Sequence, residues 1–253
     1  MGFLKEKNNL KETDIDITPI RLADYKKIIF FTGAGMSKES GIPTYRGEGG
    51  TWDEYNYRDY ACQSAFEYDP EKVLIFHEKR RKEALSCKPH LGHMIISNLA
   101  KIHSSVYIIT QNIDGMHQRA NSKDVLELHG SLWKMRCETE GTIYEDLDNG
   151  KYSTRYCDCG NILRPDIIWF QDILKEKVVQ NAISMISSCD LFVSIGTSAV
   201  VYPAAGFPRL AKDSGAFCIE INPEKTELSQ IFDEVIREKA SNGLALLKKQ
   251  ITD

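Results

Sequence analysis

The stretch that decides the fold reads Lys26-Lys27-Ile28-Ile29-Phe30-Phe31-Thr32-Gly33-Ala34-Gly35-Met36-Ser37-Lys38-Glu39-Ser40-Gly41-Ile42-Pro43-Thr44-Tyr45-Arg46-Gly47. Residues 28–31 form an unbroken apolar, β-prone run, which is typical of a short strand buried on both faces. The chain then turns sharply at residues 33–35, and a helix is expected to follow. This stretch therefore predicts a strand, a glycine-rich turn and a helix in succession.

The glycine-rich turn is a candidate phosphate site. Free backbone N–H groups at the positive end of a helix dipole bind a phosphate or pyrophosphate. Glycine is needed there because a side chain would hold the ligand's oxygens away from the backbone. The alternative is an ordinary tight turn, since the dinucleotide-binding fingerprint has a third glycine where this chain has Lys38. From this stretch alone, both interpretations stay open.

Composition limits the classes of protein to consider. A chain of 253 residues can form one large domain, or one domain with an insert. The net charge of −4 gives no basic footprint for nucleic acid. No apolar run approaches the roughly 18 residues of a membrane span, and residues 1–16 are too charged for a signal peptide. Seven scattered cysteines, an odd number, favour a reducing cytoplasm. We therefore expect a cytoplasmic protein with no membrane or nucleic-acid partner.

Helical and strand patterns alternate along the chain. A polar lead-in (1–25) precedes the first strand, and residues 46–62 are expected to form a mobile loop over a site. Helices are expected at 70–86, 90–100, 176–187, from 203 and at 240–250, and strands at 106–110, 125–128, 191–195 and 217–221. Residues 132–166 differ in character and are interpreted as a small inserted module. This order predicts an α/β fold, a Rossmann-like parallel sheet covered by helices on both faces.

Polar motifs follow the predicted strands, at the edge where α/β sheets place their ligands. The motifs are GAGMSKESGIPTYRG, TQNIDGMH, ELHGS, GTS and Ile-Asn-Pro at 221–223. In this order they resemble the sirtuins, the NAD-dependent protein deacylases, and the match covers about residues 26–245. The resemblance implies a Rossmann-like domain (26–131 and 167–253) interrupted by a small module (132–166). It also implies that NAD binds in the crevice between the two and is consumed as a co-substrate.

The resemblance assigns cofactor-binding residues by position. Those for the pyrophosphate and the loop that covers the cofactor would be Gly33, Ala34, Gly35, Ser37, Pro43, Tyr45 and Arg46. Tyr45 stands where the family usually has Phe. The nicotinamide amide and its ribose would be held by Gln111, Asn112, Ile113 and Asp114. The adenosine half would contact Gly196, Thr197, Ser198, Asn222 and Ala240.

His129 matches the family's general base, and Asn112 and Asp114 complete the implied catalytic set. A neutral imidazole with a pKa near 6.5 can accept a proton at cellular pH. In the implied reaction nicotinamide leaves C1′ of the ribose, the acyl oxygen attacks that carbon, and His129 takes a proton from the ribose diol. The products would be free lysine, nicotinamide and O-acyl-ADP-ribose. A substrate peptide would lie beside Ile168 and Phe170.

The zinc module of the family is altered here. It has two Cys-x-x-Cys pairs, but here Tyr156 and Glu140 stand at two of the four positions. Cys137, Cys157 and Cys159 remain as candidate ligands. Three thiols and one carboxylate could bind a metal tetrahedrally, but the spacing Cys157-x-Cys159 would close a cramped ring. We therefore expect a metal-free module.

A second departure concerns the acyl group. Relatives that prefer succinyl and malonyl groups carry Tyr-x-x-Arg on the helix after Pro70, and this chain has His77 and Arg80 there. Residues three apart share one helix face, so the pair could bind an acyl carboxylate. Lys38, where those relatives have Ala, could crowd that pocket. The alternative is that His77 and Arg80 lie on a solvated helix face.

Three functions remain open at this stage. The first is an NAD-dependent lysine deacylase, either a deacetylase or a desuccinylase/demalonylase. The second is a mono-ADP-ribosyltransferase or NAD hydrolase, as in divergent relatives of the family. The third is a non-catalytic NAD sensor, which would carry a damaged catalytic set. The presence of His129 and of a peptide-binding segment favours the deacylase.

Overall fold

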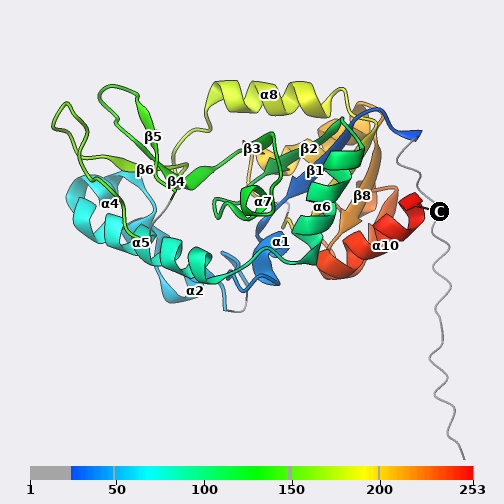
Figure 1. The fold of residues 1–253 in the computed structure, drawn as a ribbon, viewed down its shortest axis with the longest axis horizontal. Coiled ribbons are helices and arrows are strands. Elements are labelled where there is room, and N and C mark those ends of the chain that lie inside the picture. Colours follow the sequence, from blue (N-terminus) through cyan, green and yellow to red (C-terminus); the bar gives the residue numbers. More distant parts are fainter. Residues whose placement is uncertain (1–23, 48, 148–149, 199, 253) are drawn as a thin grey trace, which may run out of the picture.

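The computed structural model of the chain describes residues 24–47, 49–147, 150–198 and 200–252. Its centre is a six-stranded parallel sheet (Figure 1) in the order β3-β2-β1-β7-β8-β9. The strands are β1 (Ile28–Thr32), β2 (Val106–Thr110), β3 (Val125–Glu127), β7 (Leu191–Ile195), β8 (Phe217–Ile221) and β9 (Glu234–Ile236). The predicted fold class is confirmed, and β9, which is too short to show periodicity, was not predicted from the sequence.

Strand β1 lies in the middle of the sheet and explains the apolar run. All of its residues are buried, and it pairs in register with β2 on one side and β7 on the other. Ile28 and Phe30 contact the core on one face of the sheet, whereas Ile29 and Phe31 contact the core on the other. A strand covered on both faces cannot alternate polar with apolar residues, so its sequence is continuously apolar.

Helices cover both faces. One face is covered by α6 (Leu91–Ile102) and α10 (Ala240–Thr252), which lie side by side. The other face is covered by α8 (Glu176–Ile186) and α9 (Phe207–Asp213), with the short 3-10 helix η2 (Ala204–Gly206) before α9. The short helices α1 (Ala34–Lys38) and α7 (Met116–Arg119) begin within the motifs after β1 and β2, and η3 (Ser229–Ile231) precedes β9.

A second, antiparallel sheet forms at the other end of the molecule (Figure 1), in the order β5-β4-β6. Its strands are β4 (Gly130–Arg136), β5 (Ile143–Glu145) and β6 (Arg164–Ile167). Helices α4 (Gln63–Tyr68) and α5 (Pro70–Ser86) share with it a separate apolar cluster that includes Val73, Leu74 and Trp133. Two segments that connect strands of the central sheet, one between β1 and β2 and one between β3 and β7, therefore join at this end. The division into residues 26–131, 132–166 and 167–253 stays a prediction.

Residues 46–62 are not an irregular loop, so this prediction was wrong. The described part of this segment contains α2 (Thr51–Glu54) and α3 (Tyr57–Tyr60). The ring of Trp52 packs against Tyr57, Phe76 and Phe170, with centroids 5.6–6.4 Å apart. These aromatic contacts to distant segments order the chain here, and the polar residues between them concealed the helices from a reading of local composition.

The other helices and strands that the sequence predicts lie where they are expected, with end shifts of a few residues. Helix α5 begins at Pro70, and the Asp69 carboxylate caps it by accepting a hydrogen bond from the backbone N–H of Lys72.

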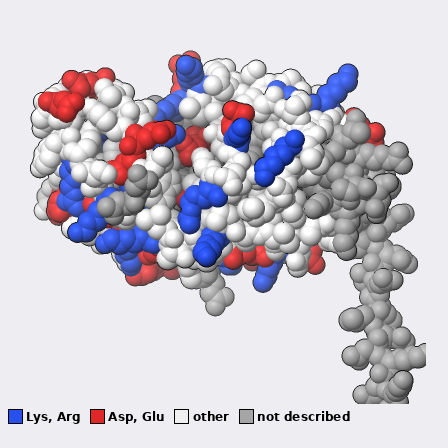
Figure 2. Space-filling view, in the orientation of Figure 1, with Lys and Arg blue, Asp and Glu red and all other residues white. Residues whose placement is uncertain are grey.

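The N-terminal lead-in (1–25) falls almost entirely outside the described residues. In the described part of the chain, no helix has the length and apolar composition needed to cross a bilayer. Figure 2 shows basic and acidic side chains interspersed over one face. The absence of a nucleic-acid partner stays a prediction.

Candidate functional site

A cavity of about 1250 Å³ lies at the carboxyl ends of β1, β2, β7 and β8 and extends to α5 and to the segment after β6. Most of the predicted cofactor and substrate residues line it: Gly33, Ala34, Gly35, Tyr45, Arg46, His77, Arg80, Gln111, Asn112, Ile113, His129, Ile168, Phe170, Gly196, Thr197, Ser198, Asn222 and Ala240. A smaller pocket shares Tyr45, Arg80, Asn112 and Ile113 with the cavity and adds Ser37, Pro43 and Asp114. The fold thus brings every predicted cofactor and substrate residue to one connected site. Lys38 also lines the cavity and is exposed.

Three glycines pack backbone against backbone at the floor of the cavity. A Cβ atom on Gly33 would lie 2.8 Å from the carbonyl oxygen of Gly196, and one on Gly35 would lie 2.7 Å from the Gly196 Cα. Gly196 itself has φ +58°, and a Cβ there would lie 2.5 Å from Gly35. These glycines are needed for the approach of two distant turns in addition to any approach of a ligand.

Asn112 ties the motif after β2 to the glycine turn. Its side chain is buried, and Nδ2 donates hydrogen bonds to the Gly33 carbonyl (2.9 Å) and to Ser37 Oγ (3.2 Å). These two bonds orient the turn after β1. They do not use the Oδ1 atom of Asn112. The nearby Gln111 Nε2 donates to Thr197 Oγ1 at 3.2 Å, which links the same motif to the turn after β7.

Asp114 lies at the inner end of this motif. One carboxylate oxygen accepts a hydrogen bond from the backbone N–H of Met116 at 2.8 Å. Burial raises the pKa of the Asp114 carboxyl, against the opposing effect of hydrogen bonds from Met116 and Ser37. The indole of Trp133 donates to the Asp114 backbone carbonyl at 2.9 Å. Trp133 therefore supports the loop that carries Asp114, and sequence reasoning missed this residue although it lies only two residues after ELHGS.

His129 presents one ring nitrogen to its own chain. Nδ1 lies 3.0 Å from the backbone carbonyl oxygen of Gln111. Since a carbonyl oxygen only accepts, Nδ1 carries the proton and the neutral ring holds its lone pair at Nε2. Burial lowers the pKa of His129 below 6.5, opposed by this hydrogen bond. The ring lines the cavity, so the arrangement supplies an unprotonated base at neutral pH.

Aromatic rings surround the end of the cavity near α5. Trp52 stacks on Tyr45 and on Phe76, with centroids 5.8 Å and 6.2 Å apart, and meets Phe170 edge-on at 5.6 Å. Four rings from three distant segments thus form one apolar wall. Trp52 and Phe76 line the cavity together with Tyr45 and Phe170.

His77 and Arg80 are both buried, at 4% and 8% exposed, which rules out the solvated helix face. His77 Nε2 accepts a hydrogen bond from the Trp169 indole N–H at 2.9 Å, so the neutral ring carries its proton at Nδ1. Burial, with the nearby guanidinium of Arg80, lowers the pKa of His77 to about 3. His77 is therefore neutral at physiological pH. Its Nδ1 is buried without a hydrogen-bond partner among the described residues.

Arg80 points its guanidinium toward the cofactor loop. Nη1 donates to Thr51 Oγ1 at 2.6 Å, and Cζ lies 5.5 Å from the centre of the Tyr45 ring. Glu83, one turn along α5, lies 3.7 Å away. Thr51 and the cation–π contact with Tyr45 hold the cation in place, and the sequence offered no signal for either contact.

Ile168 and Phe170 line the cavity on the segment after β6. The backbone N–H of Ile168 donates to the His129 carbonyl at 2.9 Å, and that of Phe170 donates to the Ala61 carbonyl at 3.0 Å. These two N–H groups are thus used within the chain. The backbone N–H of Trp169, which lies between them, donates to Asp172 Oδ2 at 3.0 Å.

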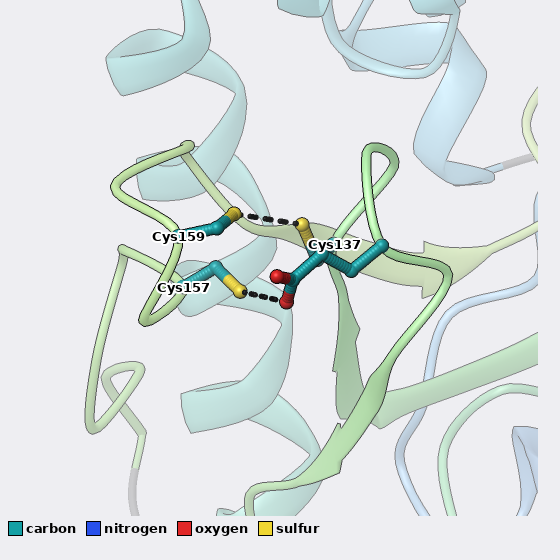
Figure 3. Close-up of side chains that lie close together, drawn as sticks. Cys137, Cys157 and Cys159 are labelled. Atoms are coloured by element: carbon teal, nitrogen blue, oxygen red, sulfur yellow. Dashed lines mark hydrogen bonds between the residues drawn. The ribbon is translucent and has the colours of Figure 1, made fainter.

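The four residues of the altered module lie together (Figure 3). Ligand atoms of Cys137, Glu140, Cys157 and Cys159 all lie within 4.8 Å of one another. The sulfur atoms of Cys137 and Cys159 are 3.6 Å apart, and Cys157 Sγ lies 3.2 Å from a Glu140 carboxylate oxygen. Tetrahedral bonds of about 2.3 Å to one zinc would separate two sulfurs by roughly 3.8 Å. The distances between these donors therefore fit a zinc ion. The two-residue spacing of Cys157 and Cys159 does not prevent their sulfur atoms from lying within reach of the other two donors.

Comparison with known proteins identifies relatives along most of the chain. Residues 33–203 match the Sir2 family. An NAD-dependent protein deacylase of Aquifex aeolicus is 41% identical over 219 residues, 86% of this chain and 92% of the relative. Among solved structures, a mutant Sir2 homologue with ADP-ribose superposes with a TM-score of 0.85 at 37% identity, covering 90% of this chain and 92% of that one. A Sir2 homologue with NAD gives 0.83 at 38% identity, with 90% of each chain covered.

Proposed function

This chain belongs to the Sir2 family, and from that premise we propose that it is an NAD-dependent protein lysine deacylase that forms nicotinamide and O-acyl-ADP-ribose. The observation that carries the proposal is the orientation of His129. Its Nδ1–H donates to the Gln111 carbonyl, so Nε2 is free to act as a base. The ring lines the same cavity as the residues of the NAD motifs.

NAD would lie along the carboxyl edge of the central sheet. The backbone of the Gly33–Gly35 turn and Ser37 would hold the pyrophosphate, and Arg46 would pair with it electrostatically. Nicotinamide and its ribose would lie toward Asn112, Ile113 and Asp114, under the ring of Tyr45. The adenosine half would contact the residues at the ends of β7 and β8, namely Gly196, Thr197, Ser198 and Asn222, and the start of α10 at Ala240.

NAD supplies a glycosidic bond at C1′, and the acyl oxygen would bond to that carbon as nicotinamide leaves, so the protein has to orient this oxygen and manage protons. His129 Nε2 would accept the proton of a ribose hydroxyl, and that oxygen would then attack the acyl carbon. Asn112 and Asp114 would orient the ribose and the nicotinamide amide. The lysine amine would leave with that proton, and one water would add to the remaining acyl carbon to give O-acyl-ADP-ribose. The aromatic wall around Trp52 would exclude other water from the reacting atoms.

The protein substrate would present an extended acyl-lysine segment to residues 167–171. Main-chain pairing depends on free backbone groups and tolerates changes of side chain. Ile168 and Phe170 direct their N–H groups inward. Both side chains also line the cavity, and we therefore infer that they contribute to the lysine channel.

Acidic acyl groups are the proposed preference. Arg80 is a buried fork of donors, and His77 Nδ1–H is a buried donor without a partner among the described residues. A succinyl or malonyl carboxylate that reached both would form charge-assisted hydrogen bonds. It would also give the His77 Nδ1–H a partner and so remove the free-energy cost of burying this donor unpaired. An acetyl group offers no such partner.

The altered module would hold one structural Zn²⁺ through Cys137, Glu140, Cys157 and Cys159, contrary to the metal-free expectation from spacing. The support is the mutual approach of the four donors within 4.8 Å. The metal would cross-link the β4–β5 turn to the segment before β6, and it would take no part in the reaction.

All seven cysteines are free thiols in the structure, which agrees with a proposed cytoplasmic location.

Mass spectrometry of the NAD-derived product tests the function. Incubation of the protein with NAD and a panel of acyl-lysine peptides should yield O-acyl-ADP-ribose, free lysine peptide and nicotinamide. ADP-ribosyl-protein or free ADP-ribose as the main product would instead support the transferase or hydrolase. NAD binding without turnover of any peptide would identify a sensor.

A further inference from the structure

The turn that follows the peptide segment contains a strained residue. The backbone N–H of Asp172 donates to the carbonyl of Trp169 at 3.1 Å, which closes a β-turn with Gln171 in its third position. Gln171 has φ +74°, the left-handed value that a type II turn requires there and that glycine adopts without strain. A glutamine is therefore retained in a conformation that does not suit it.

Neighbouring residues hold the turn without help from the glutamine side chain. Asp172 Oδ2 accepts hydrogen bonds from the Trp169 backbone N–H at 3.0 Å and from Arg164 at 2.8 Å. Arg164 is 1% exposed, and its guanidinium carbon lies 3.6 Å from the centre of the Trp169 ring. This network fixes the backbone on both sides of Gln171, which is the condition under which strain persists at functional sites.

The Gln171 side chain is available to a ligand. It is exposed, and it lines the same cavity as Ile168, Phe170 and His129. Its amide makes no hydrogen bond to another residue in the described part of the chain. The amide is both a donor and an acceptor, so it can pair with a peptide group or with a polar side chain of either kind.

We propose that the Gln171 amide binds the substrate polypeptide beside the acyl-lysine and so helps to determine which flanking residues the enzyme accepts. This inference rests on the proposed deacylase function. Glutamine is neutral, so the wild type should accept flanking residues of either charge. The turn itself needs no side chain at this position, which separates a role in binding from a role in folding.

Steady-state kinetics with matched peptides test the proposal. Gln171→Gly should raise the KM for the peptide about threefold to tenfold, the worth of one or two hydrogen bonds, with the KM for NAD unchanged. Gln171→Asn keeps an amide on a residue that tolerates positive φ, and it should restore part of the loss. Asn121→Gly is the matched control, since Asn121 is also exposed at positive φ (63°) and does not line the cavity.

Gln171→Glu gives a readout that a structural role would not move. We compare kcat/KM for a peptide that carries Lys next to the acyl-lysine with kcat/KM for a peptide that carries Glu there. The ratio of the first to the second should be at least about threefold higher in Gln171→Glu than in the wild type. Equal KM values and equal flank preferences in all variants of an active enzyme would overturn the inference alone. A wild type that deacylates no peptide with NAD would overturn the proposed function and this inference with it.

Discussion

The indole N–H of Trp169 donates a hydrogen bond of 2.9 Å to Nε2 of His77, and the two rings stack with centroids 5.6 Å apart. Trp169 belongs to the segment proposed to pair with the substrate, whereas His77 lies on α5. This contact joins the two walls of the acyl end of the cavity. It also selects the tautomer of His77 that has its proton at Nδ1.

Removing the cation at the acyl end should change the acyl preference. The wild type should use succinyl- or malonyl-lysine peptides roughly ten- to a hundredfold better than acetyl-lysine, the worth of a desolvated charge-assisted contact. Arg80→Met should erode this preference and leave deacetylation nearly intact. The measurement is kcat/KM for each acyl peptide. Lys79→Met, on the adjacent and half-exposed residue, is the control. Equal loss of both activities in Arg80→Met would contradict the assignment.

Loss of the proposed base should stop turnover and spare binding. His129→Ala should lower kcat at least about a hundredfold, and NAD should still raise the melting temperature. The wild-type rate should fall on the acid side only below pH 6.5, because burial lowers the pKa of His129. His103→Ala is the control, since His103 does not line the cavity. An active alanine variant would remove His129 from the mechanism.

Burial of His93 should make the fold sensitive to acid. This residue is fully buried, neither ring nitrogen has a partner among the described residues, and burial lowers its pKa to about 2. The unfolded chain therefore binds the extra proton. The contribution of His93 is complete above pH 6.5 and falls by about 1.4 kcal/mol per pH unit below it.

The variant His93→Leu removes this titration and leaves an apolar side chain of similar size. Between pH 7 and pH 5 its melting temperature should rise relative to the wild type by about 4–8 °C, since the free energy of unfolding changes by about 2 kcal/mol. Thermal unfolding at several pH values measures this. Parallel curves for the two proteins would show that His93 is protonated in the unfolded and folded states alike.

The altered module should contain metal. Protein purified without chelator should hold about one Zn²⁺ per chain, measured by elemental analysis, and removal of the metal should lower the melting temperature. Cys137→Ser and Glu140→Gln should both reduce the zinc content. Cys87→Ser should not, because that thiol lies outside the cluster. A wild type that contains no zinc, together with unchanged stability in Glu140→Gln, would show instead that the module holds no metal.

A methyl group on the first glycine of the turn should disturb the site. The Cβ of Gly33→Ala would lie 2.8 Å from the Gly196 carbonyl, which should cost about 1–3 kcal/mol of stability and abolish most of the stabilisation by NAD. Gly206→Ala is the matched control, since a Cβ there meets nothing within 4 Å. NAD affinity that is unchanged in a folded Gly33→Ala protein would argue against binding at this turn.

The sequence by itself determined the parallel sheet and the residues that meet at its edge. Strands β1, β2, β7 and β8 are short apolar runs. A continuous apolar run is visible in the local sequence, and it indicates a strand that is buried on both faces. Each motif follows a strand directly, and the carboxyl ends of parallel strands lie at one edge. Gly33, Asn112 and His129 could therefore be placed in one site before any coordinates were known.

Tertiary structure alone decided the properties that depend on contacts between distant segments. Trp169 and the surrounding core make His77 neutral and buried. The packing of Trp52 turned an expected loop into helices. Glu140 and Cys157 approach one another although their spacing departs from the family's pattern. Periodicity reports only which face of an element is apolar. Desolvation, hydrogen-bond partners and backbone strain at Gln171 depend on which segments meet, and this is established only when the chain has folded.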